Sequence, residues 1–202
     1  MPACLISALP VLAGYLMGSI PFGLLLASAK NVDPRRVGSG NIGATNVLRA
    51  AGKLPALLTL LADGLKGAAA VGLARLAGLD PFWQGIAGLA AVVGHCLPVF
   101  LKFKGGKGVA TGLGVICAYA PLMGVAGLAI WILTAAVSRY SSLSALSAFA
   151  LMPVAGFLLG AGKAKILIVI VLFAFILWTH RGNVRRLLGG TERKIGEREK
   201  TA

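Results

Sequence analysis

The sequence has few charged residues, and acidic residues are the scarcest of them. Charged side chains make up 13% of its 202 residues, whereas a soluble domain has about a quarter. Only six residues are Asp or Glu, against twenty Lys and Arg, which gives a net charge of +14. Such a composition argues against a soluble globular domain.

Cysteine is also scarce. Cys4, Cys96 and Cys117 lie in or beside apolar segments, and their spacing is not that of paired ligands. A disulfide framework and a structural zinc site are therefore not indicated. We expect small packing residues here, with no metal and no cofactor in the protein.

Long apolar runs take the place of charge. Residues 3–29 and 109–137 contain no charged side chain, and about 20 apolar residues suffice for a helix to cross a membrane. The first run lacks the basic start and the cleavage pattern of a signal peptide, so we interpret it as a retained helix. Seven apolar segments can be drawn, at residues 3–29, 54–78, 82–101, 108–119, 121–137, 143–161 and 164–179.

The sequence thus predicts an all-α integral membrane protein, a bundle of seven transmembrane helices in one domain over residues 1–202. Pro121 suggests a turn between the fourth and fifth segments, because proline removes a backbone donor. One tilted helix of 29 residues is the alternative, and it would leave six crossings.

The basic residues indicate the orientation. If the amino terminus lies outside, sixteen of the twenty Lys and Arg residues face the cytoplasm, including those of a basic tail at 180–202. The positive-inside rule favours this arrangement, with a cytoplasmic carboxyl terminus. Joining the fourth and fifth segments would turn the tail outward, so the charges favour seven. These charges border membrane helices and suit anionic lipids; no aromatic-interleaved patch indicates nucleic-acid binding.

A Gly-x-Gly-x-x-Gly spacing stands at Gly38, Gly40 and Gly43. A dinucleotide-binding turn needs a preceding strand and a βαβ unit, but an apolar helix precedes these glycines. The phosphate loop of nucleotide hydrolases also fails, because Leu101 stands where it needs glycine and Gly108 where it needs Ser or Thr. The physics beneath both motifs remains: glycine-rich backbone ahead of a helix N-terminus can approach an anion closely.

Three predicted cytoplasmic segments share this character: "GSGNIGATN" (38–46) with Arg49 after it, "KFKGGKGVAT" (102–111), and "HRGNVRRLLGGTERKIG" (180–196). Together they gather hydroxyls, amides and basic groups, with few carboxylates, on one membrane face. Such a pocket suits a multiply anionic substrate better than a cation, a glycoside or a peptide.

In their order along the chain and in their amino-acid sequence, these segments resemble the motifs of the bacterial acyl-phosphate:glycerol-3-phosphate acyltransferase family. The resemblance extends to "GYLMGSIPFG", "DGLKG", "GHCLPVF" and "RYSSL" and so covers nearly the whole chain. It implies transfer of a fatty acyl group from acyl-phosphate to the 1-hydroxyl of glycerol-3-phosphate, giving lysophosphatidic acid and phosphate. It also implies a multi-pass protein of the bacterial cytoplasmic (inner) membrane whose active site faces the cytoplasm.

The residues and the resemblance together predict the site. We expect catalytic roles for His180, Asn183, Ser39 and Arg49. We expect substrate contacts from Gly40, Asn41, Thr45, Asn46, Lys104, Gly105, Gly106, Lys107 and Ser142. Acyl-phosphate is already activated, so no protein nucleophile is required. The His-x-x-x-x-Asp pair of another acyltransferase class is absent, since Phe100 and Arg185 stand at its Asp position.

Some assignments stay open. His180 orients the acceptor hydroxyl or takes its proton, or else the substrate phosphate is the base. His95 either lines the pocket or makes a structural hydrogen bond near Pro98. Asp63 and Lys66 share a helix face and can pair, which we interpret as scaffold, and we expect Glu192 to tie down the tail. A transporter for an organic phosphate is the main alternative function, although no inverted repeat is visible.

Overall fold

The computed structural model describes residues 3–197, and all the regular secondary structure in this part of the chain is helical. The helices are α1 (Ala3–Gly18), α2 (Phe22–Ser28), α3 (Ala44–Ala51), α4 (Lys53–Leu76), α5 (Pro81–Cys96), α6 (Val109–Tyr119), α7 (Pro121–Ser138), α8 (Ser141–Leu158), α9 (Lys163–Thr179) and α10 (Arg181–Leu188). Two 3-10 turns, Pro34–Arg36 and Val99–Leu101, lie in the connections. The expected all-α architecture is confirmed over the described residues.

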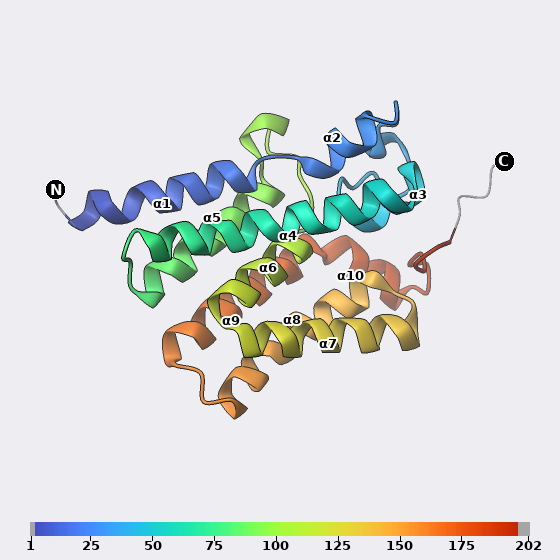
Figure 1. The fold of residues 1–202 in the computed structure, drawn as a ribbon. Coiled ribbons are helices and arrows are strands. Elements are labelled where there is room, and N and C mark those ends of the chain that lie inside the picture. The colour runs from blue at the N-terminus through green and yellow to red at the C-terminus, as the bar shows by residue number, and fades with distance from the viewer. Residues whose placement is uncertain (1–2, 198–202) are drawn as a thin grey trace.

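The long helices run side by side, and the short ones gather at one end of the bundle (Figure 1). Helix α4 packs against α1, α5 and α6, while α8 packs against α7 and α9. The amphipathic helices α3 and α10 lie at the right-hand end in the view of Figure 1, together with α2 and the chain after α10. The first and third polar segments singled out in the sequence, around α3 and α10, therefore meet at one end of the molecule.

Helices α4 and α6 approach each other very closely. A Cβ on Gly114 would overlap the carbonyl oxygen of Gly64, and one on Gly67 would overlap that of Thr111. Small residues permit this close packing between membrane helices, where dispersion rather than the hydrophobic effect drives association. The start of α6 is thereby fixed against the middle of α4.

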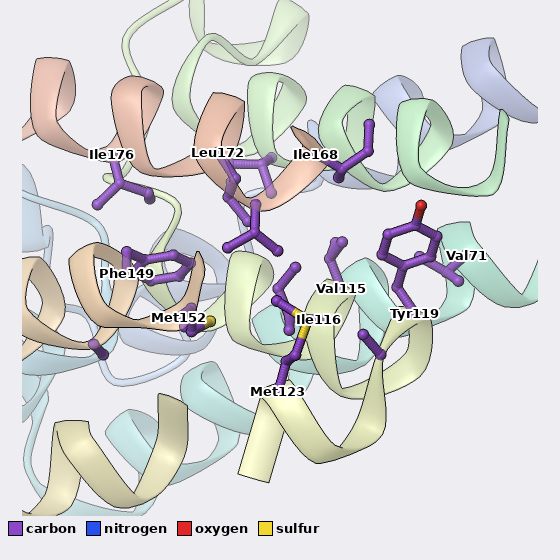
Figure 2. Packing of buried hydrophobic residues seen from close by; sticks show 14 of the residues in the cluster. Val71, Val115, Ile116, Tyr119, Met123, Phe149, Met152, Ile168, Leu172 and Ile176 are labelled. Carbon is purple, nitrogen blue, oxygen red and sulfur yellow. The ribbon is translucent and has the colours of Figure 1, made fainter. Parts of the chain in front are cut away.

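The core lies where α6, α8 and α9 meet (Figure 2). Ile116, Phe149, Met152, Leu172 and Ile176 are fully buried there. The outward faces are apolar too: on α4, Leu57 and Leu61 are each 52% exposed and Leu65 is 68% exposed. Leucines spaced by four along one face and facing outward are expected where lipid surrounds the protein.

Helices α6 and α7 are separate and meet at Ala120 and Pro121, as the sequence predicted. Within residues 3–197, five segments are long and apolar enough to cross a membrane, and a sixth is added if α9 and α10, bent by 64°, form one span. Helix α6 has 11 residues, about 16 Å of helix, roughly half a hydrocarbon core. The structure thus gives a multi-pass membrane protein, and the finer count of seven crossings stays a prediction.

The first apolar segment is not one helix, contrary to the expectation for residues 3–29. It breaks between Gly18 and Phe22, because Pro21 cannot donate to the helical ladder. Lys66 Nζ donates to the carbonyl of Ile20 at the break, 2.9 Å away. A buried charge on α4 thus satisfies a carbonyl that the broken helix leaves without a helical partner.

Candidate active site

One pocket of about 600 Å³ opens at the end of the bundle where α3 and α10 lie. Its polar lining includes nine of the predicted site residues: Ser39, Asn41, Thr45, Asn46, Arg49, Lys107, Ser142, His180 and Asn183. Its apolar lining comes from α4, α6 and α7, with Leu60, Leu113, Leu128, Trp131 and Ile132. The pocket therefore joins a basic, hydrogen-bonding end to a hydrocarbon end.

Asn46 holds the glycine-rich loop together from the first turns of α3. Its side chain is buried, accepts from Ser39 N (2.9 Å) and donates to the carbonyls of Pro34 and Asn41, each at 2.8 Å. Gly38 has a left-handed φ of 61°, which glycine adopts without strain. The side-chain amide of Asn46 is thus engaged by backbone atoms of the loop. The geometry therefore favours a role for Asn46 in fixing the conformation of the loop over the substrate contact that we expected.

The neighbouring loop residues differ in whether their side chains are already hydrogen-bonded within the protein. Asn41 accepts from Gly43 N at 2.7 Å, and Thr45 shares a hydrogen bond of 3.0 Å with Ser141 at the start of α8. Ser39 is exposed and lines the pocket. Gly40 is not part of the pocket lining, so a substrate bound in this pocket does not reach it in the present geometry. Its predicted substrate contact stays a prediction.

Arg49 is the cation of α3 that lines the pocket. Its Nη2 donates to the carbonyl of Lys194 at 3.1 Å, while its buried Nε has no hydrogen-bond partner among the described residues. Burial and the nearby charge of Arg193 lower the pKa of Arg49, but a guanidinium stays charged at neutral pH. Arg49 therefore keeps a donor and a full charge for an anion in the pocket.

Lys107 enters the pocket just before α6. Burial lowers its pKa to about 8, Glu192 opposes this shift, and Arg186 and Arg49 reinforce it. Gly108, with φ of 81°, turns the chain into α6, and Val109 and Ala110 also line the pocket. The first-turn amides of a helix have no intrahelical acceptor, so a lysine and a helix N-terminus converge here on an anion site.

The preceding glycines do not form the expected phosphate cradle. Gly105 N donates to the carbonyl of Cys96 (3.1 Å) and Gly106 N to that of His95 (3.0 Å), and neither glycine lines the pocket. Lys104 is exposed and also lies outside the lining. Their N–H groups dock the segment on α5, so this geometry does not favour amide contacts from Gly105 and Gly106 to the substrate, and those contacts stay a prediction.

His180 caps α9 at the bend into α10 and is 2% exposed. Its Nδ1 lies 2.8 Å from the carbonyl of Ile176, which can only accept, so we assign the hydrogen to Nδ1 and a free lone pair to Nε2. Burial, followed by the charge of Lys107, lowers the pKa of His180 to about 4. The imidazole is therefore neutral at physiological pH and can accept a proton at Nε2.

Glu192 anchors the chain after α10 over the pocket. Ser142 Oγ (2.7 Å) and Asn183 Nδ2 (2.6 Å) donate to its Oε1, and Arg186 Nε (2.8 Å) donates to its Oε2. Burial alone would raise its pKa, but these hydrogen bonds hold it below the ordinary value. The expected tail-fixing role of Glu192 is confirmed, and two predicted site residues, Ser142 and Asn183, serve it.

The tail is fixed at two further points. Ile195 N donates to the carbonyl of Arg139 at 2.7 Å, and Lys194 Nζ lies over the ring of Tyr140. Together with the bond from Arg49 to Lys194, these contacts hold the chain after α10 against α3 and the connection between α7 and α8. Arg198 and Lys200 of the predicted basic tail lie outside the described residues.

A buried cluster of charged and polar groups adjoins the polar end, and the sequence analysis found only part of it. Asp63 pairs with Lys66 at 2.8 Å, as expected, but His95 Nδ1 also faces Asp63 Oδ1 at 3.4 Å. Asp63 and His95 both line the pocket. A search by sequence spacing missed this His–Asp contact because its members come from two helices.

The apolar lining was missed altogether. Leu128, Trp131 and Ile132 have helical spacing on α7, but every face of that helix is apolar, so periodicity does not separate pocket from lipid. Among the described residues, no group of three or more His, Cys, Asp and Glu could hold a metal. The free cysteines are Cys96, which is buried, and Cys117, which is exposed; neither lines the pocket. The side chain of Cys4 is outside the described part.

Comparisons with known proteins agree with this geometry. A family model described as glycerol-3-phosphate acyltransferase matches residues 8–190. Two curated proteins of that name are similar to the chain. The protein from Rubrobacter xylanophilus is 52% identical over 194 residues, 96% of this chain and 98% of the relative. The protein from Sinorhizobium fredii is 55% identical over 188 residues, 92% of this chain and 90% of the relative.

Two crystal structures of PlsY (YgiH), an integral membrane glycerol 3-phosphate acyltransferase, are also similar. The glycerol 3-phosphate form has a TM-score of 0.89 and 41% identity, covering 94% of this chain and 96% of that one. The lysophosphatidic acid form has a TM-score of 0.87 and 40% identity, covering 94% and 95%. The family model matches most of this chain, and the curated relatives share about half of their aligned residues with it. This chain therefore belongs to the glycerol-3-phosphate acyltransferase family of membrane proteins.

Proposed function

We propose that the protein transfers a fatty acyl group from acyl-phosphate to the 1-hydroxyl of glycerol-3-phosphate. The products are 1-acyl-glycerol-3-phosphate (lysophosphatidic acid) and phosphate, at an early step of phospholipid synthesis. The hydroxyl oxygen attacks the acyl carbonyl carbon, the bond from that carbon to the phosphate oxygen breaks, and the hydroxyl proton leaves. Membership of the family and the two forms in which the similar PlsY was crystallised support this reaction.

The single observation that carries the proposal is the two-part pocket. Acyl-phosphate is a hydrocarbon chain with an anionic head, and the pocket joins apolar side chains of α4, α6 and α7 to a basic end. A soluble organic phosphate would have no use for the apolar half. A transporter for such a compound is therefore less well supported than the acyltransferase.

The polar end offers two separate anion-binding elements. Lys107 and the N-terminus of α6 form one, and the guanidinium of Arg49 on α3 forms the other. Because both substrates carry phosphate, two such elements side by side hold the acceptor and the donor head near each other. Positioning of this kind converts a bimolecular reaction into an effectively unimolecular one.

His180 is the group best placed to handle the proton. Its Nδ1–H is engaged by Ile176, so the Nε2 lone pair is directed at other partners, and the residue lines the same pocket. Nε2 accepts the proton from the 1-hydroxyl as the bond to the acyl carbon forms, then returns it to the departing phosphate. The net reaction leaves the imidazole unchanged.

The same pocket supports direct transfer without an acyl-protein intermediate. Cys96 is buried in the core and Cys117 lies away from the pocket. His95 faces Asp63 through Nδ1, but its Nε2 edge packs over Gly106, so this pair does not activate a hydroxyl in the pocket. We therefore expect acyl-phosphate, and not acyl-coenzyme A, to be the donor.

We further propose that the polar end faces the cytoplasm of a bacterium, with the amino terminus outside and the protein in the inner membrane. The basic residues around α3, the 102–107 segment and α10 support this orientation through the positive-inside rule.

The reaction is tested with purified protein in detergent, palmitoyl-phosphate and glycerol-3-phosphate. We expect release of inorganic phosphate and formation of lysophosphatidic acid in equal amounts, both dependent on glycerol-3-phosphate. Palmitoyl-coenzyme A in place of palmitoyl-phosphate should give no product. Uptake of glycerol-3-phosphate into sealed vesicles without any chemistry would instead support the transporter.

A further inference from the structure

A buried cluster links the break in the first apolar segment to the 105–107 segment. Lys66 Nζ contacts both Asp63 Oδ1 (2.8 Å) and the carbonyl of Ile20 (2.9 Å), and Asp63 in turn faces His95. Asp63 and His95 are 2% and 5% exposed. Charged groups buried among membrane helices are costly and are retained where they serve function, but the proposed reaction assigns this cluster no step.

The end of α5 holds the segment that carries Lys107. The amides of Gly105 and Gly106 donate to the carbonyls of Cys96 and His95, and Thr179 Oγ1 donates to the carbonyl of Lys107 at 3.1 Å. The His95 ring covers Gly106 directly, because a Cβ on Gly106 would overlap its Nε2. The backbone one residue before Lys107 therefore rests against the imidazole edge.

We propose that His95, whose Nδ1 faces Asp63 Oδ1 at 3.4 Å, is a positioning residue that sets where Lys107 meets the substrate phosphate. Gly106 is glycine because the ring occupies the space of a Cβ, and not because an anion approaches its N–H. This inference rests on the proposed function and adds to it the residues that place the phosphate-binding lysine.

The alternative is that Gly106 lies against the substrate itself. Its amide is already donated to His95 O, and the residue is buried and absent from the pocket lining. A substrate contact would require that bond to break, whereas the ring contact exists in the structure. The two explanations predict different outcomes when Gly106 and His95 are changed together.

The test is a double-mutant cycle with Gly106→Ala, His95→Asn and the pair combined. Asn at 95 keeps an amide facing Asp63 but removes the ring edge over Gly106. We expect Gly106→Ala to raise the KM for glycerol-3-phosphate about tenfold or more while kcat changes much less. His95→Asn alone should also raise this KM, and adding Gly106→Ala to it should raise the KM little further, because residues in contact are strongly non-additive.

Gly105→Ala is the matched control. A Cβ there would overlap the carbonyl oxygen of His95 and contact Pro98 Cδ and the carbonyl of Cys96. Those are backbone and ring atoms that His95→Asn does not remove, so Gly105→Ala should raise the KM by a similar factor with and without His95→Asn. Non-additivity of both glycine variants with His95→Asn would contradict the proposal, because it would report general loosening of the segment.

Losses that multiply in the Gly106→Ala, His95→Asn double variant would overturn the inference and favour direct contact between substrate and glycine. Folded protein is compared by thermal unfolding in detergent, and His95→Ser provides a second small replacement if His95→Asn does not accumulate. The wild-type control separates the two proposals. A wild type without glycerol-3-phosphate-dependent turnover contradicts the proposed function, whereas an active wild type with an additive cycle contradicts this inference alone.

Discussion

At the scale of single residues, the pocket is characterised by how each ionisable group is held. His180 is tied through Nδ1 to Ile176, and Arg49 is tied through one amino group to the tail. Among the described residues, no hydrogen-bond partner is seen for Nε of Arg49 or Nε2 of His180, the positions from which these groups can act on a substrate. Fixed donors and acceptors of this kind stabilise developing charge without reorganising at the moment of reaction.

The proton-accepting role of His180 is tested by two replacements. His180→Ala should lower kcat by about 10² to 10³, a loss typical of removing one well-placed group from a transition state. His180→Asn should lose as much, although its amide can still donate to Ile176 as Nδ1 does. Recovery of activity in His180→Asn under saturating substrates would show that the Nδ1 contact matters and that the substrate phosphate is the base.

The lowered pKa of Lys107 predicts that kcat/KM for glycerol-3-phosphate depends on pH. Its pKa of about 8 means that the pocket loses this positive charge as the pH rises from 7 to 9. Phosphate monoesters have a second pKa of about 6, so the substrate charge is constant over this range. We expect kcat/KM for glycerol-3-phosphate to fall through about pH 8.

A Lys107→Arg variant is the control for that profile, because a guanidinium stays charged throughout. It should bind less well in absolute terms but show a flat profile from pH 7 to 9. An unchanged inflection near pH 8 in this variant would assign the titration to another group.

At the scale of secondary-structure elements, the position of the first turn of α6 determines the geometry of the pocket. Glycines on α4 and α6 let the two helices touch, and Gly108 turns the chain so that the first turn of α6 faces the pocket. Helix α7 supplies most of the apolar lining, with Leu128, Trp131 and Ile132. The acyl chain in our proposal therefore lies between α4, α6 and α7.

This placement predicts which residue of α7 limits the length of the acyl chain that the enzyme accepts. Leu128 lies ten residues before the end of α7, about 15 Å of helix from the polar end, and is partly exposed. Leu128→Trp should fill this part of the groove and lower kcat/KM for palmitoyl-phosphate more than for octanoyl-phosphate. The measurement is the ratio of the two values, with Leu133→Trp, outside the lining, as the control; equal losses for both chains would place the acyl group elsewhere.

At the scale of the whole molecule, α3 and the chain after α10 lie at the same end of the bundle (Figure 1), and Lys107 lines the same pocket as their residues. The tail, the α3 loop and the Lys107 segment must then face the same side of the membrane. A single cysteine at position 37 or 190, in a variant without the natural cysteines, should resist an impermeant maleimide in intact cells. It should react once the cells are opened.

A cysteine at position 162, between α8 and α9, should behave in the opposite way if the proposed orientation holds. Labelling of position 37 in intact cells would reverse the orientation.

Much of this protein was determined by the sequence itself. Uncharged runs longer than a bilayer is thick specify membrane helices, and Pro121 specifies the break between α6 and α7, because it lacks an amide hydrogen. Glycines, hydroxyls and cations in three segments specify an anion site. These features are local, so periodicity and composition are enough to find them.

Tertiary structure alone decided how the local pieces combine. The Asp63–His95 contact joins two helices, and the amides of Gly105 and Gly106 donate to carbonyls at the end of α5. The apolar half of the pocket is invisible in a helix that is apolar on every face, because lipid and acyl chain select the same side chains. Only the packing of α4, α6 and α7 separates the surface that faces lipid from the surface that lines the pocket.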